Sequence, residues 1–318
     1  MDKTQLIYIV FGAVIFLALV FDLGLLSKKN TVVSMKSALM QTIFWVLLAL
    51  AFFAFVWFER DQKVALEYLS AYLMEWSLSI DNIFVFILIF SSFNVKEKFY
   101  GRVLLIGIMM AILFRIIFIT VGVALVDQFH WILYVFGVFL LYTGYKMFTS
   151  TEDEEFDPHD TKVYRFLKKF LPLAPHDGNG RYVIRENGRP MYTTLFVVVV
   201  LLAAIDLVFA LDSIPAVMGI TRDKMVIYTS NIFAVLGLRS LFFLLRGAVS
   251  KFDYLQQGIA IVLVFIGVKM LAEHWINQLV DKNVQVLISL VLIILCITGS
   301  IVYSMYHQKK GAPKDVKS

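Results

Sequence analysis

Long apolar segments recur along this chain and constrain its fold more than any other feature. The sequence is 60% hydrophobic, whereas only about half of a soluble domain is apolar. A helix needs about 20 apolar residues to cross the hydrocarbon core of a bilayer. The sequence therefore predicts an all-α, polytopic membrane protein that forms one transmembrane domain over residues 1–318. We expect nine transmembrane helices, at 5–26, 38–58, 68–91, 102–126, 130–148, 194–218, 226–248, 256–274 and 283–306.

Basic residues are distributed unevenly between the two sides of these helices. The loops and tail on one side contain 19 Lys and Arg residues, and those on the other contain six. Because cytoplasmic loops carry an excess of Lys and Arg, we expect the C-terminus and the long 149–193 loop in the cytoplasm and the N-terminus outside. The expected location is the inner (plasma) membrane. The first segment carries Asp22 and is followed by no small-residue cleavage site, so we expect it to remain as a helix.

Two acidic motifs lie inside the predicted helices. They read Glu75-Trp-Ser-Leu-Ser-Ile-Asp81-Asn82-Ile and Asp206-Leu-Val-Phe-Ala-Leu-Asp212-Ser213-Ile-Pro215. In both motifs, two carboxylates stand six residues apart, and an Asn or Ser follows the second. A charged group at bilayer depth costs roughly 3 kcal/mol or more, so such residues usually face a polar interior and carry function.

Further matches indicate an internal duplication. Leu113-Phe-Arg115 corresponds to Gly237-Leu-Arg239, and Thr143-Gly144-Tyr-Lys146 corresponds to Ile266-Gly267-Val-Lys269. Each unit contains three helices, an odd number, so the second unit must enter the membrane from the opposite side. We expect an inverted 3+3 repeat that holds a substrate near the midplane. Repeat one covers 68–148, repeat two covers 194–274, and the helices at 5–26, 38–58 and 283–306 are peripheral.

The 149–193 loop contains two recognisable patterns. Basic and apolar residues mix over Lys162 to Leu171, which predicts a short amphipathic helix on an anionic leaflet. The Asn187-Gly188 pair predicts a β-hairpin. Neither pattern is typical of a catalytic site.

Oxygen atoms dominate the candidate metal site. Its residues are Glu75, Asp81, Asn82, Asp206, Asp212 and Ser213. The five histidines lie in loops or at helix ends, and a single cysteine, Cys296, excludes a thiolate cluster. An all-oxygen site favours Mn²⁺, Ca²⁺ or Mg²⁺ over copper or zinc. Acids six residues apart on an ideal helix differ by about 120° and 9 Å. They could bind one ion if the helix unwinds between them, or if each pairs with an acid of the other repeat.

Charge counting gives two interpretations of this site. The four carboxylates of the motifs contribute a charge of −4, and the charge-balancing Arg115 and Arg239 contribute +2. The remaining net charge of −2 would be neutralised by one divalent cation or by two protons. Lys146 and Lys269 lie near helix ends, where snorkelling to the interface is expected. Alternatively, the acids form structural ion pairs with the two arginines.

The motifs resemble those of the TerC family of integral membrane proteins, and within it the Alx-like branch. Two further segments are similar to that family's signatures, and the resemblance covers about residues 5–306. They are Trp131-Ile-Leu-Tyr-Val-Phe-Gly-Val-Phe-Leu-Leu-Tyr-Thr-Gly-Tyr-Lys-Met147 and Thr229-Ser-Asn231-Ile-Phe-Ala-Val-Leu-Gly-Leu-Arg239. The resemblance implies manganese efflux for the Alx-like branch and tellurite resistance for others. The family's second motif usually has Glu three residues before Asp206, where this chain has Ala203.

We therefore expect a non-enzymatic Mn²⁺ exporter, with Ca²⁺ or Mg²⁺ less favoured, that exchanges the metal ion for protons. Its partners are then the metal ion, protons and the lipid bilayer, not nucleic acid. The alternative is a membrane scaffold, an assembly partner or a tellurite-resistance component. An intramembrane enzyme is a further rival, but the helices contain no His-Glu-x-x-His, Gly-x-Gly-Asp or Ser/His pairing.

Overall fold

A computed structural model describes residues 3–21, 33–149, 157–186, 188–246 and 254–311, and these residues are almost entirely helical. The long helices are α1 (Lys3–Phe21), α2 (Met35–Glu59), α3 (Gln62–Ser92), α4 (Glu97–Gln128), α5 (Ile132–Thr149), α7 (Thr194–Ile220), α8 (Lys224–Leu245), α9 (Leu255–Leu271) and α11 (Lys282–Gly311). Shorter elements are η2 (Pro158–Asp160), α6 (Lys162–Phe170), η3 (Gly178–Gly180), β1 (Val183–Glu186), β2 (Arg189–Tyr192) and α10 (Glu273–Leu279).

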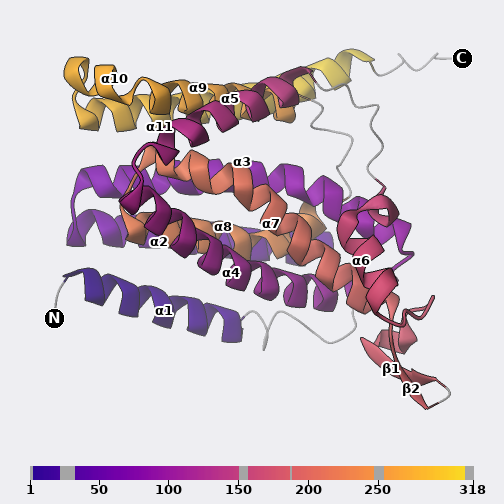
Figure 1. Cartoon of the computed structure of the whole chain (residues 1–318). Helices are drawn as coiled ribbons and strands as arrows, with labels where there is room; N and C mark the ends of the chain where they lie inside the picture. Colours follow the sequence, from indigo (N-terminus) through magenta and orange to yellow (C-terminus); the bar gives the residue numbers. More distant parts are fainter. Residues whose placement is uncertain (1–2, 22–32, 150–156, 187, 247–253, 312–318) are drawn as a thin grey trace, which may run out of the picture.

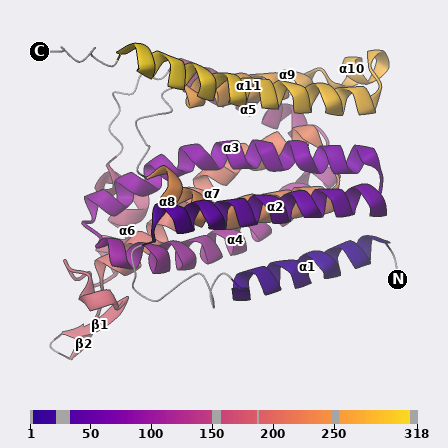
Figure 2. The ribbon, with the colours of Figure 1, turned by 180° about the vertical axis from the view of Figure 1, so that it is seen from behind.

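The helices form two layers. Helices α2, α3, α4, α7 and α8 make a central bundle, and α5, α9, α10 and α11 lie together above it, with α1 below (Figure 1). The view from behind has the same arrangement (Figure 2). Helices α5 and α9 pack on α7, and α11 packs on α3. Each layer therefore combines helices from both halves of the sequence.

Polar residues at the helix ends explain where several helices begin. The Asp61 carboxylate accepts a hydrogen bond from Val64 N at 2.9 Å and starts α3 directly after α2. The Asp223 carboxylate caps α8 in the same way, only three residues after α7 ends. Such caps satisfy the free N–H groups of the first helical turn. They fix two tight turns: α2 packs beside α3, and α8 packs mainly on α3, α2 and α4.

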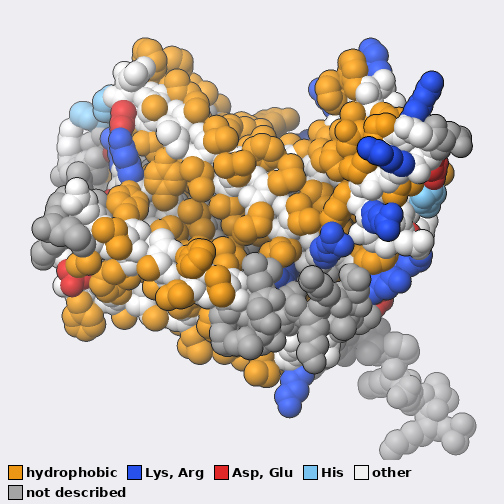
Figure 3. Space-filling view, turned by 90° about the horizontal axis from the view of Figure 1, so that it is seen from below, with side chains coloured by type: hydrophobic (Ala, Val, Ile, Leu, Met, Phe, Trp, Pro, Cys, Tyr) orange, Lys and Arg blue, Asp and Glu red, His pale blue; other side chains and the backbone are white. Residues whose placement is uncertain are grey.

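Apolar surface covers the middle of the molecule, as a lipid-facing protein requires. Orange hydrophobic side chains dominate the face seen from below, and Lys and Arg gather at the right-hand end (Figure 3). Among the described residues, five helices are long and apolar enough to cross a membrane: α2, α4, α7, α8 and Asn283–Ser304 of α11. The pair α9 and α10 would add a sixth if it is one span, although it bends by 82°. Helices α1 and α5 are apolar but shorter.

All nine segments predicted to cross the membrane coincide with helices. The number of these helices that cross the membrane stays a prediction. Helix α3 is 31 residues long, about 46 Å at 1.5 Å per residue, which is long enough to cross a bilayer, but it is not among the five helices that meet both criteria. The predicted 256–274 segment is not one straight helix, because the chain bends between α9 and α10. Residues 22–26 and 247–248 of two predicted segments lie outside the described residues.

Helices α5 and α9 cross at unusually close range. A Cβ atom at Gly144 would lie 2.9 Å from the Ala260 carbonyl oxygen, and one at Gly267 would lie 2.8 Å from the Gly137 carbonyl oxygen. Later residues of α5 thus contact earlier residues of α9, so the two helices run antiparallel. Only glycine lets the backbones approach this closely, as small residues do at membrane helix contacts.

The long loop folds as the sequence predicts. Helix α6 occupies Lys162–Phe170, and β1 pairs with β2 so that Glu186 lies opposite Arg189. Gly188 has φ of +77° in the turn, a conformation that glycine adopts readily. Asn187, the other turn residue, lies outside the described residues.

Candidate functional site

The guanidinium group of Arg115 lies at the centre of a buried polar cluster. Arg115 on α4 donates to Asp206 on α7 through Nε at 2.7 Å and Nη2 at 3.0 Å, one bond to each carboxylate oxygen. Its Nη1 atom also donates to Glu75 Oε2 on α3 at 2.8 Å. Both acids are at most 1% exposed. The bidentate ion pair between Arg115 and Asp206 is a strong interaction and fixes the orientation of both side chains.

Asn231 on α8 completes this cluster. Its Nδ2 donates to Glu75 Oε1 at 2.6 Å, and its Oδ1 accepts from Arg115 Nη1 at 2.6 Å. One acid from each predicted repeat is thereby held by the same arginine. We call Glu75, Arg115, Asp206 and Asn231 the Arg115 cluster. Its net charge is −1 when both acids are ionised.

Asp212 has a hydrogen-bond partner outside the Arg115 cluster. It follows Asp206 by six residues on the continuous helix α7, so it projects about 120° away and 9 Å further along. Its carboxylate is only partly buried, and Thr143 Oγ1 on α5 donates to Oδ1 at a long 3.3 Å. This bond connects the central bundle to the upper layer. Among the described side chains, Asp212 has no ion pair.

Two buried hydroxyl groups lie beside the motif acids. Ser79 on α3 and Ser213 on α7 are each 1% exposed, and neither Oγ has a hydrogen-bond partner among the described residues. Leaving a buried polar group unpaired costs about 1–3 kcal/mol. Such atoms therefore indicate places where a bound ion or water would contribute the missing contact.

The remaining predicted site residues are placed as follows. Asn82 is buried on α3, Arg239 is buried on α8, and Ala203 is fully buried on α7, one turn before Asp206. The side chain of Asp81 lies outside the described residues. Among the described side chains, no three His, Cys, Asp or Glu residues lie together as a metal-binding group.

The helices do not unwind at the motifs. Helix α3 is continuous through Glu75 and Asp81, and α7 is continuous through Asp206, Asp212 and Pro215. Of the two arrangements expected from the sequence, the unwound helix is therefore wrong. The acids of the two repeats do approach one another, but at Arg115 rather than directly, because an arginine between two carboxylates removes their mutual repulsion.

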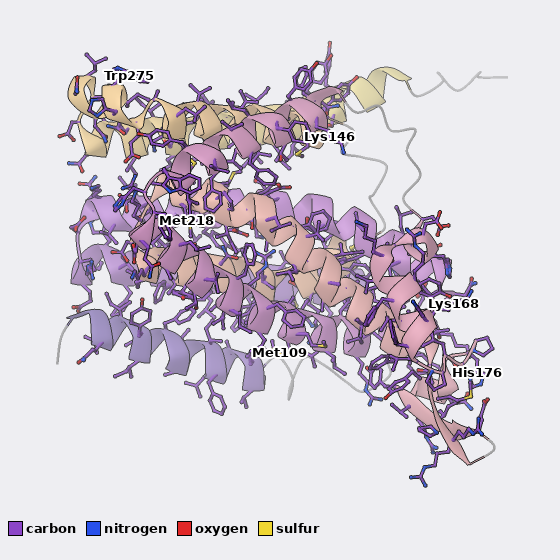
Figure 4. The ribbon with its side chains drawn as sticks, in the orientation of Figure 1. Met109, Lys146, Lys168, His176, Met218 and Trp275 are labelled. Atoms are coloured by element: carbon purple, nitrogen blue, oxygen red, sulfur yellow. The ribbon has the colours of Figure 1, made fainter. Side chains whose placement is uncertain are left out.

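Lys269 differs from the expectation of a snorkelling side chain. It donates to Ser289 Oγ on α11 at 3.1 Å and lines a cleft of about 340 Å³ at the α7–α8 turn. Glu67 on α3 lines the same cleft and accepts a hydrogen bond from Thr221 Oγ1. Figure 4 labels Met218, which also lines this cleft, on α7 beneath the upper layer. Because Glu67 and Lys269 carry opposite charges, adding both leaves the charge balance of the site unchanged.

Three further residues have defined hydrogen bonds near these acids or the cleft but do not belong to the acidic motifs: Thr143, Glu67 and Asn231. Asn231 and Thr143 both stand inside segments that resemble family signatures, and that was the available signal for them. Their partners lie 69 or more positions away along the chain. Glu67 gave no signal, because it falls just before an apolar segment.

Comparison with known proteins agrees with the membrane fold. Residues 60–312 match the family described as "Integral membrane protein TerC family". An uncharacterized membrane protein of Myxococcus xanthus is 40% identical over 305 residues, covering 96% of this chain and 93% of its own. A Rickettsia felis membrane protein, also uncharacterized, is 40% identical over 295 residues, covering 93% and 97%.

Some similar proteins have names that describe a role. Alx of Escherichia coli K12 is 37% identical over 317 residues, which cover 97% of this chain and 98% of Alx. Its name describes a membrane-bound redox modulator and marks that role as provisional. No solved structure matches the chain. From the family match and these relatives together, the chain belongs to the TerC family of integral membrane proteins.

Proposed function

We propose that this protein exports a divalent metal ion, preferentially Mn²⁺, in exchange for protons. The observation that carries the proposal is the pair of buried hydroxyls at Ser79 and Ser213, which lack partners among the described residues and flank the motif acids. Together with the carboxylate of Asp212, they offer oxygen ligands of the type that hard divalent cations prefer. The proposed substrate site comprises Asp81, Asn82, Asp212 and Ser213, with Ser79 beside them.

The Arg115 cluster divides the acids into two roles. Glu75 and Asp206 are held by Arg115 and are already neutralised in part. They therefore shape the site and tune its charge, whereas Asp212 is the better ligand. Glu75 and Asp206 are then not ligands of the ion, in contrast to a site in which all four acids bind it equally.

Reciprocal packing supports the inverted repeat. Gly144 and Gly267 occupy matching positions of the two repeats, and each approaches a carbonyl that lies seven residues before the other. Helix α3 packs on α8 and, in the matching combination, α7 packs on α4. A two-fold axis between the repeats would generate both relationships. An axis of this kind in the membrane plane is typical of secondary transporters.

Energetics favour coupling to protons. Moving a divalent cation out of a cell against ~100 mV costs about 4.6 kcal/mol, twice ~2.3 kcal/mol per charge. A passive carrier would therefore fill the cell with Mn²⁺. Exchange of one Mn²⁺ for two protons is electroneutral and escapes this cost. The positive-inside rule orients the exporter with the α6 end in the cytoplasm.

A flux experiment tests the proposal. The purified protein is reconstituted in liposomes with a Mn²⁺-sensitive dye inside. An imposed pH gradient should drive Mn²⁺ uphill, and a membrane voltage alone should move it little. Flux that follows voltage but ignores pH would contradict proton exchange. No flux under either condition, with an intact fold, would contradict the exporter itself.

One observation favours a second function, that of a membrane scaffold. Glu75 and Asp206 do form buried ion pairs with Arg115, as a structural role requires. The two functions differ at Asp212, which has no ion pair among the described side chains. Mn²⁺ binding that disappears in Asp212→Asn but persists in Glu59→Gln, an acid at the end of α2, would favour the exporter.

A further inference from the structure

Among the described residues, helix α6 contacts the rest of the protein along one of its sides. Leu167 is buried, and the Tyr164 ring packs 5.5 Å from that of Phe93 and 4.9 Å from that of His159. The Thr161 hydroxyl accepts a hydrogen bond from Tyr164 N and caps the helix. Helix α6 is therefore a rigidly placed element with a defined outer surface.

That outer surface is aromatic and basic. Phe166 and Phe170 are 60% and 61% exposed, and their ring centroids lie 4.6 Å apart. Four exposed cations surround this pair: Lys162, Arg165, Lys168 and Lys169. None of the four has an ion pair among the described residues, and α6 itself contains no acid. We call these six residues the α6 patch.

The position of α6 places this patch at the edge of the apolar belt. Helix α6 packs on α7, near its first turns, and on η2, which also contacts α3. It lies at the right-hand end of the bundle, where Figure 4 labels Lys168 on α6 and His176 near the hairpin (Figures 1 and 4). Basic side chains gather at this same end next to the hydrophobic surface (Figure 3).

We propose that the α6 patch docks on the headgroups of an anionic lipid leaflet. Phe166 and Phe170 enter the boundary between headgroups and acyl chains, where aromatic rings are favoured. The four cations contact lipid phosphates, and each should raise the preference for an anionic surface roughly fivefold. Charge complementarity selects this occupant, because an apolar protein partner would leave four cations unpaired. This proposal does not depend on metal export.

The test uses a fluorescent probe on the full-length protein. Phe166→Cys, in a Cys296→Ser background, is labelled with an apolar environment-sensitive dye and placed in nanodiscs. The discs contain phosphatidylcholine alone or phosphatidylcholine with phosphatidylglycerol. A matched control carries the same dye at Val183→Cys in β1, which is exposed at the same end but outside the α6 patch. A second variant replaces the four cations with glutamine and keeps Leu167.

The expected result is a blue shift at position 166 in the anionic discs that high salt reduces. The shift should be absent at position 183 and in the glutamine variant. Equal emission at position 166 in both kinds of disc would overturn the proposal. It would instead fit neutralisation by the acidic segment 152–155, which precedes α6 in the sequence. A shift that persists in the glutamine variant would also overturn it.

Discussion

Arg115 and Asp206 form a two-point ion pair between α4 and α7, with donor–acceptor distances of 2.7 and 3.0 Å. Both side chains are about 2% exposed, so the pair is shielded from solvent. Taking two charges into such a place is costly, and removing one partner leaves the other uncompensated. Removing one partner of this pair should therefore cost more stability than breaking an exposed pair.

Removal of this arginine should destabilise the fold strongly. We expect Arg115→Gln to lower the free energy of unfolding by about 3–5 kcal/mol, because Glu75 and Asp206 lose their shared counter-charge. Adding Glu75→Gln and Asp206→Asn should recover part of the loss. Thermal unfolding in detergent measures both. Lys224→Met, which breaks an exposed pair with Asp127, is the control and should change little. Equal effects of Arg115→Gln and Lys224→Met would contradict this expectation.

Asp212 should dominate metal binding. Asp212→Asn keeps the shape but removes the charge, so Mn²⁺ affinity measured by calorimetry should fall at least tenfold. Thr143→Val removes the hydroxyl that contacts Asp212 and should weaken binding less, and Thr143→Ser should restore it. Thr120→Val, a hydroxyl change on the exposed side of α4, serves as the control. Unchanged affinity in Asp212→Asn, with the fold intact, would remove Asp212 from the site.

Ala203→Glu should raise Mn²⁺ binding or export if the usual family acid supplies a ligand or a proton carrier. The new side chain would start one helical turn before Asp206, on nearly the same face of α7. Ala203 is fully buried, so the larger side chain should also cost about 1–3 kcal/mol of stability. Binding, flux and melting temperature are measured together. If binding and flux both stay at the parental level, the missing ligand is supplied elsewhere.

The close crossing of α5 and α9 should not tolerate a side chain at Gly144. A Cβ there would meet Val264 Cγ2 at 2.8 Å and backbone at 2.9 Å. We expect Gly144→Ala to destabilise the protein by about 1–3 kcal/mol. Gly299→Ala on α11, where nothing lies within 4 Å of the new atom, should be neutral or stabilising. Thermal unfolding of the two variants compares them directly, and similar melting temperatures would refute the tight contact.

The ion pair between Lys96 and Asp177 should make the docking of segment 177–192, which contains the hairpin, sensitive to acid. Lys96 Nζ lies 2.7 Å from Asp177 Oδ2, and this hydrogen bond holds the pKa of the carboxyl below its ordinary value of 3.8. A lowered folded-state pKa gives stability that is present above 3.8 and is lost as pH falls through the folded pKa. Hydrogen exchange of the 177–192 amides, corrected for intrinsic rates, should therefore accelerate in acid. In Lys96→Met the pKa of Asp177 returns toward its ordinary value, so this acid-dependent acceleration should become smaller. An unchanged profile would contradict this link.

The sequence by itself determined the class of the protein. Apolar length dictates transmembrane helices, because the bilayer core offers no partner for an exposed backbone. Patterns local to a few residues predicted α6 and the hairpin: a mixture of basic and apolar residues for the helix, and an Asn-Gly pair for the turn. The two acidic motifs also followed from sequence alone, since ionisable residues at bilayer depth are rare enough to be informative.

Only the tertiary structure decided how the acids are used. Asp206 and Asp212 look equivalent in sequence, yet α7 turns one toward Arg115 and the other toward Thr143. Asn231 joins Glu75 from 156 positions away, a distance over which no local pattern carries information. The arrangement of the helices in layers was also decided by tertiary packing, since α5 and α9 meet through the close approach of their backbones at Gly144 and Gly267. Helix periodicity determines which residues share a face, but packing between helices determines which partner that face meets.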